Sequence, residues 1–262
     1  MENKNILLDV RDNVAHIILN RPDVANTLDE EMSREFMQVI IRCSEEPMVR
    51  AILISGAGRM FCGGGDLKKF SAQGEYLSSH LKEIAIYSHV VISGLLRLEA
   101  PVIAAVHGSA AGAGMSLACA CDIVVAAENT RFTTGYTRVG LSPDWSSTYL
   151  LPRLVGLRRA LELLMTNRVL TAQEALEWGI VTQVLPEAEF LEKACALAVQ
   201  LAAGPTKALG AAKRLLYSGY NESLETQMEN ESQAISSLGY TADAHEGITA
   251  FLEKRAASFI GK

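Results

Sequence analysis

The 262-residue sequence is short of the features that mark several classes of protein. Basic residues are in deficit, with 24 Lys and Arg against 30 Asp and Glu. The resulting net charge of -6 disfavours a nucleic-acid binder, because phosphate binding relies on a basic surface. The five cysteines form no Cys-x-x-Cys pair, so neither a zinc site nor a disulfide framework is indicated. Free cysteines fit a reducing compartment.

Targeting and membrane signals are also lacking. The first residues show neither an apolar core nor an Arg-rich amphipathic run, and residues 259–262 are no peroxisomal address. The uncharged stretch 100–121 is too rich in glycine and too weakly apolar to span a membrane. It predicts a buried strand, a turn and a helix instead. We therefore expect a cytoplasmic protein that does not contact a membrane.

What the sequence does contain is the composition of a globular α/β protein, with 49% apolar and 21% charged residues. Residues 30–43 predict an amphipathic helix, and a long helical region is expected to end near residue 98. Runs rich in β-forming residues predict five strands: 6–10, 14–19, 51–55, 101–106 and 123–127.

The remainder of the sequence is nearly all helical. Thr171 and Glu174 form a capping box, the signature of a helix start. Pro186 and Pro205 each predict the beginning of a further helix. Two last helices are expected over 224–238 and 242–255. The sequence thus predicts an α/β core over residues 1–200 and a helical C-terminal extension over residues 201–262.

Two glycine-rich loops follow predicted buried strands. The first runs from Phe61 to Leu67 (FCGGGDL), and the second runs from His107 to Met115 (HGSAAGAGM) into a predicted helix. Glycine lets the backbone approach a ligand closely, and free N–H groups can face an anion or a developing oxyanion. Neither loop has the Gly-Lys-Ser/Thr sequence of a phosphate loop. Each loop alone is equally typical of a turn or of close packing between a helix and a strand.

Together, in this order and spacing, the two loops resemble those of the crotonase superfamily, also called the enoyl-CoA hydratase/isomerase family. The resemblance implies the crotonase fold, in which a superhelix of β-β-α units carries the acyl-CoA site. It also implies a homotrimer or a dimer of trimers, in which the C-terminal extension serves trimerisation and CoA contacts. No cofactor or metal is implied, because CoA enters with the substrate. Six stretches carry the resemblance: 20–22, 61–67, 101–122, 140–156, 172–181 and 246–261.

The resemblance assigns the oxyanion hole for a thioester oxygen to two backbone N–H groups, those of Gly65 and Ala113. Ala113 stands where the family usually has glycine, which keeps the donor but narrows the space above it. The segment at Ala25 and Asn26 corresponds to a strip that lines the adenine site. Phe251 and Lys254 correspond to residues that contact the nucleotide of CoA. Further substrate contacts are expected from the two glycine-rich loops: Gly63, Gly64, Asp66, Leu67, Gly112 and Gly114.

The reaction depends on the acid and base groups. Ser116 and Tyr136 occupy the positions of the two glutamates with which hydratases of this family activate water. Neither is a carboxylate, so the usual addition of water is not expected, and both are expected to contact substrate.

Asp144 supplies a different carboxylate. It ends the stretch from Val139 (VGLSPD), a pattern that most resembles bacterial enoyl-CoA isomerases of aromatic-acid degradation. That resemblance implies that Asp144 moves a proton while a double bond shifts from Δ3 to Δ2 through a thioester enolate. Trp145, expected to contact substrate, would help to exclude water and raise the pKa of the carboxyl. From the residues alone, Asp144 is equally well explained as a helix N-cap.

His89 leaves other reactions open. Together with Asp144 it resembles the pair in 4-chlorobenzoyl-CoA dehalogenase, although Tyr136 and Ser88 stand where that enzyme has tryptophan. This pair would support dehalogenating or thioesterase chemistry. Enoyl-CoA hydration by an atypical arrangement of water is a second alternative, and a non-catalytic acyl-CoA-binding protein is a third.

Overall fold

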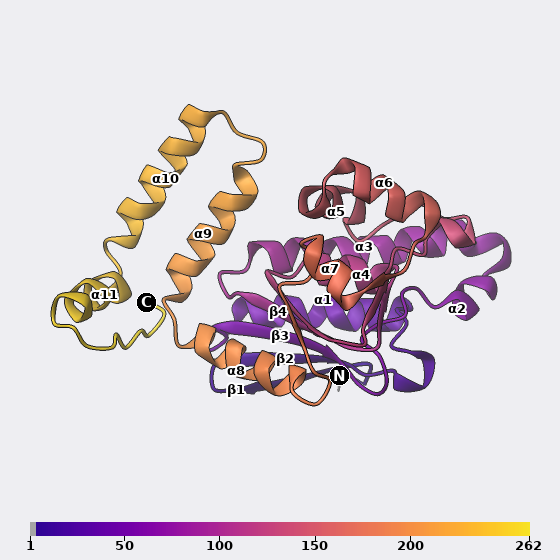
Figure 1. Ribbon diagram of the computed structural model, residues 1–262, viewed down its shortest axis with the longest axis horizontal. Coiled ribbons are helices and arrows are strands. Elements are labelled where there is room, and N and C mark those ends of the chain that lie inside the picture. Colours follow the sequence, from indigo (N-terminus) through magenta and orange to yellow (C-terminus); the bar gives the residue numbers. More distant parts are fainter. Residues whose placement is uncertain (1–3) are drawn as a thin grey trace.

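The computed structural model of the chain describes residues 4–262. A six-stranded sheet with the order β1-β2-β3-β4-β6-β9 forms its centre (Figure 1). β1 and β2 pair as an antiparallel hairpin, and every later neighbour in the sheet is parallel. The strands are β1 Ile6–Arg11, β2 Val14–Leu19, β3 Ala51–Gly56, β4 Val102–Val106, β6 Ile123–Ala127 and β9 Gln183–Leu185. A smaller sheet contains β5 Ser109–Ala111, β7 Arg131–Thr133 and β8 Leu170–Thr171.

Helices cover both faces of the large sheet, as a parallel sheet requires. The helices of the core are α1 Glu30–Glu45, α2 Leu67–Ser71, α3 Leu77–Arg97, α4 Ala113–Cys119, α5 Ser147–Val155, α6 Leu157–Thr166, α7 Ala172–Glu177 and α8 Phe190–Ala202. α8 packs on β3 and β4 from one side, whereas α1 and α3 pack together on the other (Figure 1). Short 3-10 turns occur at η1 Pro22–Val24, η2 Gly74–Tyr76 and η3 Thr137–Val139.

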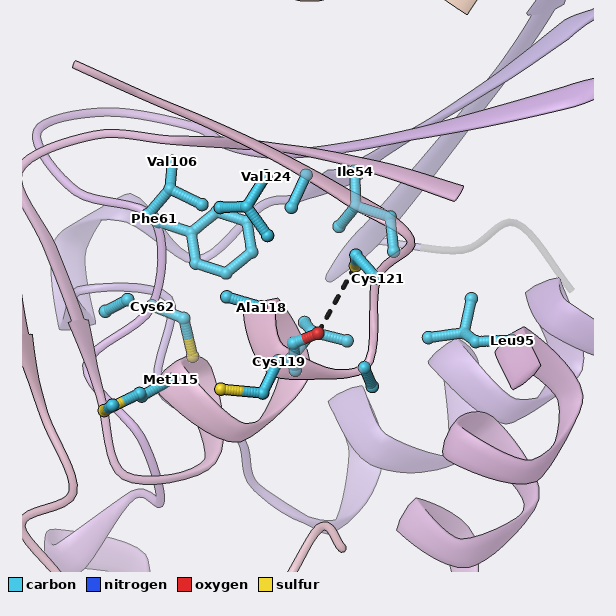
Figure 2. Packing of buried hydrophobic residues seen from close by; sticks show 14 of the residues in the cluster. Ile54, Phe61, Cys62, Leu95, Val106, Met115, Ala118, Cys119, Cys121 and Val124 are labelled. Carbon is cyan, nitrogen blue, oxygen red and sulfur yellow. Dashed lines mark hydrogen bonds between the residues drawn. The ribbon is translucent and has the colours of Figure 1, made fainter. Parts of the chain in front are cut away.

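The larger hydrophobic core lies on the α1, α3 and α4 side of the sheet. Figure 2 shows Phe61 and Cys62 of the first glycine-rich loop beside Met115 and Cys119 of α4. Every residue of α4 is buried, which is why this helix carries no charge. The uncharged stretch 100–121 is therefore strand, turn and buried helix, as predicted. Within residues 4–262, no helix combines the length and hydropathy needed to cross a membrane.

The C-terminal extension comprises α9 Thr206–Ser218, α10 Leu224–Leu238 and α11 Ala242–Leu252, which project away from the sheet (Figure 1). Arg50 of the core holds its first residues, because the guanidinium donates to the Gly204 carbonyl (2.6 Å) and to Thr206 Oγ1 (3.1 Å). α8, which ends at Ala202, packs in the core, so the core continues two residues beyond the expected boundary at residue 200.

The predicted elements are largely confirmed, including the capping box of Thr171 and Glu174. Two helix bounds were wrong. The helix expected to start at Pro186 begins at Phe190, because the residues after the proline form a turn. The last helix ends at Leu252, before Arg255, because Lys254 adopts a left-handed conformation with φ 55°.

A buried ion pair joins the extension to the core. Lys213 of α9 is 8% exposed, and its Nζ donates to Asp122 Oδ2 (2.7 Å) and to the Leu95 carbonyl (2.6 Å). Asp122 Oδ2 also accepts from the Val102 N–H at the start of β4 (2.8 Å). One carboxylate thus links α9 to the central strand of the sheet.

Replacing Lys213 by Met leaves the partly buried Asp122 carboxylate without its cation, so we expect a loss of about 1–3 kcal/mol in the free energy of unfolding. Arg214→Met is the matched control, because Arg214 on the same helix pairs with Glu99 in solvent, and an exposed pair contributes under about 1 kcal/mol. Equilibrium unfolding in urea measures both variants. Equal losses would show that the buried pair does not hold the extension.

Candidate active site

The first glycine-rich loop is held by backbone hydrogen bonds on two sides. On one side, the Cys62 N–H donates to the Ser109 carbonyl (3.1 Å), and the Ala111 N–H donates to the Cys62 carbonyl (2.9 Å). On the other side, the Leu28 N–H donates to the Gly64 carbonyl (2.7 Å). The loop after β3 therefore lies between the segment at Leu28 and the loop after β4, and it cannot move independently of either.

Two backbone N–H groups remain free within this arrangement. No oxygen of residues 4–262 accepts a hydrogen bond from the N–H of Gly65 or of Ala113, and both residues line the same cavity. The other end of each peptide unit is held, because the Gly64 carbonyl accepts from Leu28 and the Gly112 carbonyl accepts from Ser116. Fixed donors that face a cavity are what a developing oxyanion requires. The structure thus brings together the two donors expected from the sequence.

Glycine is required where the first glycine-rich loop approaches the second, at Gly64 and Gly112. Gly64 has φ 97°, and a Cβ there would lie 2.9 Å from the Ala111 carbonyl oxygen. Gly112 has φ 51° directly before the second donor. A side chain at either position would be strained in this conformation and would displace a donor. Glycine is needed at position 114 for close packing, since a Cβ there would lie 2.5 Å from the Cys62 carbonyl oxygen.

The cavity has a volume of about 330 Å³ and a largely apolar wall. Beyond the donor loops, its lining comes from α2, α3 and the segment between β7 and α5. Among residues 4–262, Asp144 is the one carboxylate in that lining, and Lys82 of α3 is its one cation. The side chains that line this part are Leu67, Phe70, Leu81, Lys82, Ile84, Ala85, Tyr136, Val139, Leu141, Ser142, Asp144 and Trp145.

The Asp144 carboxyl is half-buried in this cavity. Its Oδ1 is buried without a hydrogen-bond partner among residues 4–262. Burial raises the pKa of Asp144 above its ordinary value, while the Tyr136 hydroxyl and the charge of His89 oppose that rise. Asp144 does not cap a helix through its side chain: α5 begins at Ser147, whose N–H donates to the backbone oxygen of Asp144 (3.0 Å). The N-cap explanation was wrong, and the carboxyl is free for another role.

The backbone after Asp144 is strained. Trp145 and Ser146 have φ of 52° and 59°, a region that a bulky side chain rarely adopts. The Trp145 ring is 1% exposed and packs on Phe36 with 6.3 Å between ring centroids. Burial of this ring stabilises the unfavourable turn that presents Asp144 to the cavity, and strain of this kind is common at functional sites.

Ser116 and Tyr136 lie in direct contact. Their hydroxyl oxygens are 2.9 Å apart, and the Tyr136 hydroxyl is 3.5 Å from the backbone oxygen of Asp144. Tyr136 lines the cavity, whereas Ser116 is 2% exposed behind it. Burial raises the pKa of Tyr136 well above its ordinary value, and the negative charge of Asp144 adds to that rise. The phenol therefore stays protonated at neutral pH.

His89 lies on α3 outside the cavity lining, with an exposed side chain. Its charge nevertheless lowers the pKa of Asp144, so the two groups are within electrostatic reach of each other. Lys82, Ala85 and His89 are three and four residues apart, so they share one side of the helix. Within residues 4–262, no group of three or more His, Cys, Asp or Glu is arranged to hold a metal ion.

Several expected substrate contacts lie away from the cavity lining. Asn26 is fully buried, and its Nδ2 donates to the carbonyls of Ala57 and Met60 (2.8 Å each). Ala25 holds the loop through its carbonyl, which accepts from the Gly63 N–H (2.8 Å). These residues support the loop from behind.

The Asp66 side chain also serves the loop and not the cavity. Its carboxylate caps α2 through the Lys69 N–H (3.2 Å) and pairs with Arg21 (3.0 Å). Phe251 is 83% exposed on α11, and Lys254 follows that helix, so both lie outside the cavity lining of the single chain.

Several cavity residues were not anticipated from the sequence, and two of them, Phe70 and Lys82, add a ring and a charge to the site. The Phe70 ring covers Gly65, since a Cβ at Gly65 would lie 2.6 Å from the ring. Lys82 faces the cavity together with Leu81 and Ala85. The spacing of Lys82 and Ala85 could have placed both on one side of α3, but only the fold determines which side meets the glycine-rich loop.

Comparisons with known proteins agree with this geometry. A family model described as enoyl-CoA hydratase/isomerase matches residues 9–262. A 1,2-epoxyphenylacetyl-CoA isomerase from Escherichia coli K12 is 36% identical over 98% of either chain. A 4-chlorobenzoyl coenzyme A dehalogenase from Arthrobacter sp. is 37% identical, over 90% of this chain and 86% of the relative. The crystal structure of an enoyl-CoA hydratase from Polaromonas sp. JS666 has a TM-score of 0.93 and 32% identity, over 97% of this chain and 99% of that one.

Burial of Asp144 makes a prediction about stability. Because its pKa is raised in the folded protein, ionising the carboxyl costs stability as the pH rises from about 4, the ordinary pKa of Asp. Asp144→Asn removes that cost, so we expect a higher melting temperature than the wild type at neutral pH and a difference that vanishes below about pH 4. Thermal unfolding across pH measures this. Asp23→Asn, at an exposed position, is the control, and a pH-independent gain at residue 144 would contradict the account.

Proposed function

Because the chain belongs to the enoyl-CoA hydratase/isomerase family and has the crotonase fold expected for it, we propose that it is an enoyl-CoA isomerase. The reaction is the shift of a double bond from Δ3 to Δ2. The observation that carries this proposal is that Asp144 is the one carboxylate lining the cavity that holds the two free N–H groups. The relatives include an isomerase, a dehalogenase and a hydratase, so membership of the family alone leaves the reaction open.

The proposed mechanism uses each group once. The Gly65 and Ala113 N–H groups bind the thioester oxygen. Asp144 takes the proton from C2, and the electron pair moves into an enolate whose negative oxygen the two N–H groups stabilise. The double bond then forms between C2 and C3, and C4 takes the proton back from Asp144. The carboxylate is regenerated, no atom is gained or lost, and no cofactor is needed.

The environment of Asp144 suits this role. A base works best when its pKa lies near the working pH, and burial raises the pKa of this carboxyl in that direction. The largely apolar wall around it offers few groups that could hold water, which would otherwise exchange with the transferred proton. Oδ1 has no protein partner among residues 4–262, which leaves it available to the substrate.

Hydration is the less favoured alternative because a second carboxylate is missing from the described cavity lining. Ser116 and Tyr136, at the two positions in question, bond to each other. A hydroxyl pair of this kind lacks a base that could activate water at neutral pH.

A nucleophilic reaction is the second candidate. The observation that favours it is the electrostatic reach between His89 and Asp144. In that reaction the Asp144 carboxylate attacks the ring carbon that bears a halogen, and halide leaves as an aryl ester forms. A water that gives its proton to His89 then hydrolyses the ester, which releases the hydroxylated product and regenerates the Asp144 carboxylate. It differs from isomerisation in requiring His89.

Turnover of a 3-enoyl-CoA tests the proposal. We expect the wild type to form a conjugated 2-enoyl-CoA of unchanged mass, followed by ultraviolet absorbance and mass spectrometry. Asp144→Asn should lower kcat by about 10²–10⁴-fold, because it removes the carboxylate of the described cavity lining and with it the proton transfer. Binding of the CoA thioester should remain, since both N–H donors are intact.

The control is His89→Gln, which should keep isomerase activity. Loss of activity in that variant, or release of free CoA or halide from an aryl-CoA by the wild type, would favour the nucleophilic reaction. A mass gain of one water on a 2-enoyl-CoA would establish hydration. Binding without any conversion would indicate a non-catalytic acyl-CoA-binding protein.

We also propose that the protein assembles as a trimer or a dimer of trimers through its C-terminal extension. Large apolar side chains on this extension are exposed in the single chain, and their burial against other copies would be favourable. In such an assembly, Phe251 and Lys254 would contact the CoA nucleotide. The most exposed of these apolar side chains are Leu216 (74%), Ile235 (74%), Tyr240 (87%), Phe251 (83%) and Leu252 (75%).

Sedimentation velocity tests the assembly. With 28.3 kDa per chain, we expect the mass of three or six chains. Ile235→Glu should dissociate the assembly, because it places a charge in the proposed interface. Gln233→Glu, a polar position on the same helix, is the control and should leave the mass of the assembly unchanged. A monomeric wild type would contradict the proposal.

A further inference from the structure

Ser116 and Tyr136 form a chain of hydroxyl groups that ends on a backbone carbonyl. The Tyr136 hydroxyl oxygen lies 2.9 Å from Ser116 Oγ, and Ser116 Oγ lies 3.2 Å from the Gly112 carbonyl oxygen. Tyr136 lines the cavity, and Ser116 is buried between Tyr136 and the glycine-rich loop. The chain therefore runs from the cavity wall to the peptide that precedes Ala113.

The direction of these hydrogen bonds follows from the atoms involved. A carbonyl oxygen can only accept, so in the 3.2 Å contact Ser116 is the donor and Gly112 is the acceptor. With the Ser116 hydrogen placed on Gly112, the Tyr136 hydroxyl is the group that donates in the 2.9 Å contact, in which either oxygen can be the donor. Its 3.5 Å contact with the Asp144 backbone oxygen is at the outer limit of a hydrogen bond, so the 2.9 Å contact with Ser116 is the shorter of the two. Burial and the charge of Asp144 raise the pKa of Tyr136, so the phenol keeps this hydrogen.

The Gly112 carbonyl and the Ala113 N–H are the two ends of one planar peptide unit. A hydrogen bond donated to the carbonyl fixes the orientation of that plane and therefore of the N–H. It also polarises the peptide, because hydrogen bonds in a chain strengthen one another. The Ala113 N–H becomes a stronger and better-aimed donor as a result.

We infer that Ser116 and Tyr136 are positioning residues, which fix and polarise the Gly112–Ala113 peptide so that its N–H binds the thioester oxygen. This inference rests on the proposed function, because it requires a thioester in the cavity. Ser116 and Tyr136, which occupy the positions of the hydratase glutamates, thereby act on the oxyanion hole and do not activate water.

The Gly112 carbonyl accepts two hydrogen bonds, and the one from the Ser116 hydroxyl is additional to a backbone bond. The Ser116 N–H donates to the same Gly112 oxygen (3.0 Å), as the geometry of α4 dictates. Loss of the Ser116 hydroxyl therefore leaves that oxygen paired and the helix intact. The equivalent Gly64 carbonyl on the opposite side of the cavity has one backbone donor, Leu28, and no side-chain donor among the described residues.

Infrared spectroscopy of bound [1-13C]butyryl-CoA tests the inference directly. A saturated thioester is neither isomerised nor hydrated, so the carbonyl frequency measures polarisation by the oxyanion hole alone. We expect a shift to lower frequency on binding to the wild type and a smaller shift with Ser116→Ala. Tyr136→Phe should also give a smaller shift. The double variant should match Ser116→Ala, because Tyr136 acts through Ser116.

Kinetics provide the second readout. Removing an oxyanion donor outright costs about 10²–10³-fold in kcat, so weakening one should cost about tenfold in Ser116→Ala, with KM within about twofold. Ser88→Ala is the matched control. Ser88 is also a buried helical serine that donates to a backbone carbonyl, that of Ala85, but that peptide has no place in the oxyanion hole. The control should keep the wild-type carbonyl shift and kcat.

The outcomes separate this inference from the proposed function. An unchanged carbonyl shift in Ser116→Ala, or additive losses in the double variant, would overturn the inference. A normal pattern of carbonyl shifts in a protein that fails to isomerise 3-enoyl-CoA would overturn the proposed reaction and leave the inference standing. No shift with the wild type would overturn both.

Discussion

The backbone hydrogen bonds on both sides of residues 62–65 are the constraint on which the site depends. They join three segments that follow different strands, and among residues 4–262 they leave the N–H groups of Gly65 and Ala113 without a hydrogen-bond acceptor. Two unpaired donors in a cavity are costly for folding, since buried N–H groups are normally satisfied. In the proposed mechanism these two donors receive the thioester oxygen, and no reorganisation is needed when charge develops on it.

Hydrogen bonds and ion pairs beside this loop offset the free energy lost by leaving its N–H groups unpaired. Asn26 is buried to bond the carbonyls behind the loop, and Arg21 pairs with both Asp29 (3.1 Å) and Asp66 (3.0 Å) beside it. On the opposite wall, burial of Trp145 stabilises a strained turn that presents Asp144. Both halves of the site therefore combine an unfavourable local feature with compensating interactions close by, as is common where function and stability compete.

The elements and the donor loops could be predicted from the sequence because their signals are local. Runs of β-forming residues predicted β1 to β4 and β6, and helical periodicity predicted most helices, whereas β5, β7, β8 and β9 are only two or three residues long and were missed. The capping box at Thr171 was confirmed. The glycine-rich loops could be recognised because positive φ and close approach demand glycine at Gly64 and Gly112. Asp144 could be selected as a candidate, but its N-cap explanation was excluded only by the start of α5 at Ser147.

Interactions between segments far apart in the sequence could not be predicted in this way. Ser116 and Tyr136 are 20 residues apart, and nothing local indicates that their hydroxyls meet. Lys82 and Phe70 belong to the cavity only because α2 and α3 fold over Gly65. The burial of Asn26 likewise depends on Ala57 and Met60, which lie more than 30 residues away.

A crystal structure with a bound saturated acyl-CoA would test the central claim most directly. The account predicts the thioester oxygen at about 2.7–3.1 Å from the nitrogens of both Gly65 and Ala113. It also predicts an Asp144 carboxylate oxygen within about 3.5 Å of the carbon next to the thioester. A thioester oxygen bound by other donors, or an acyl group outside this cavity, would contradict it.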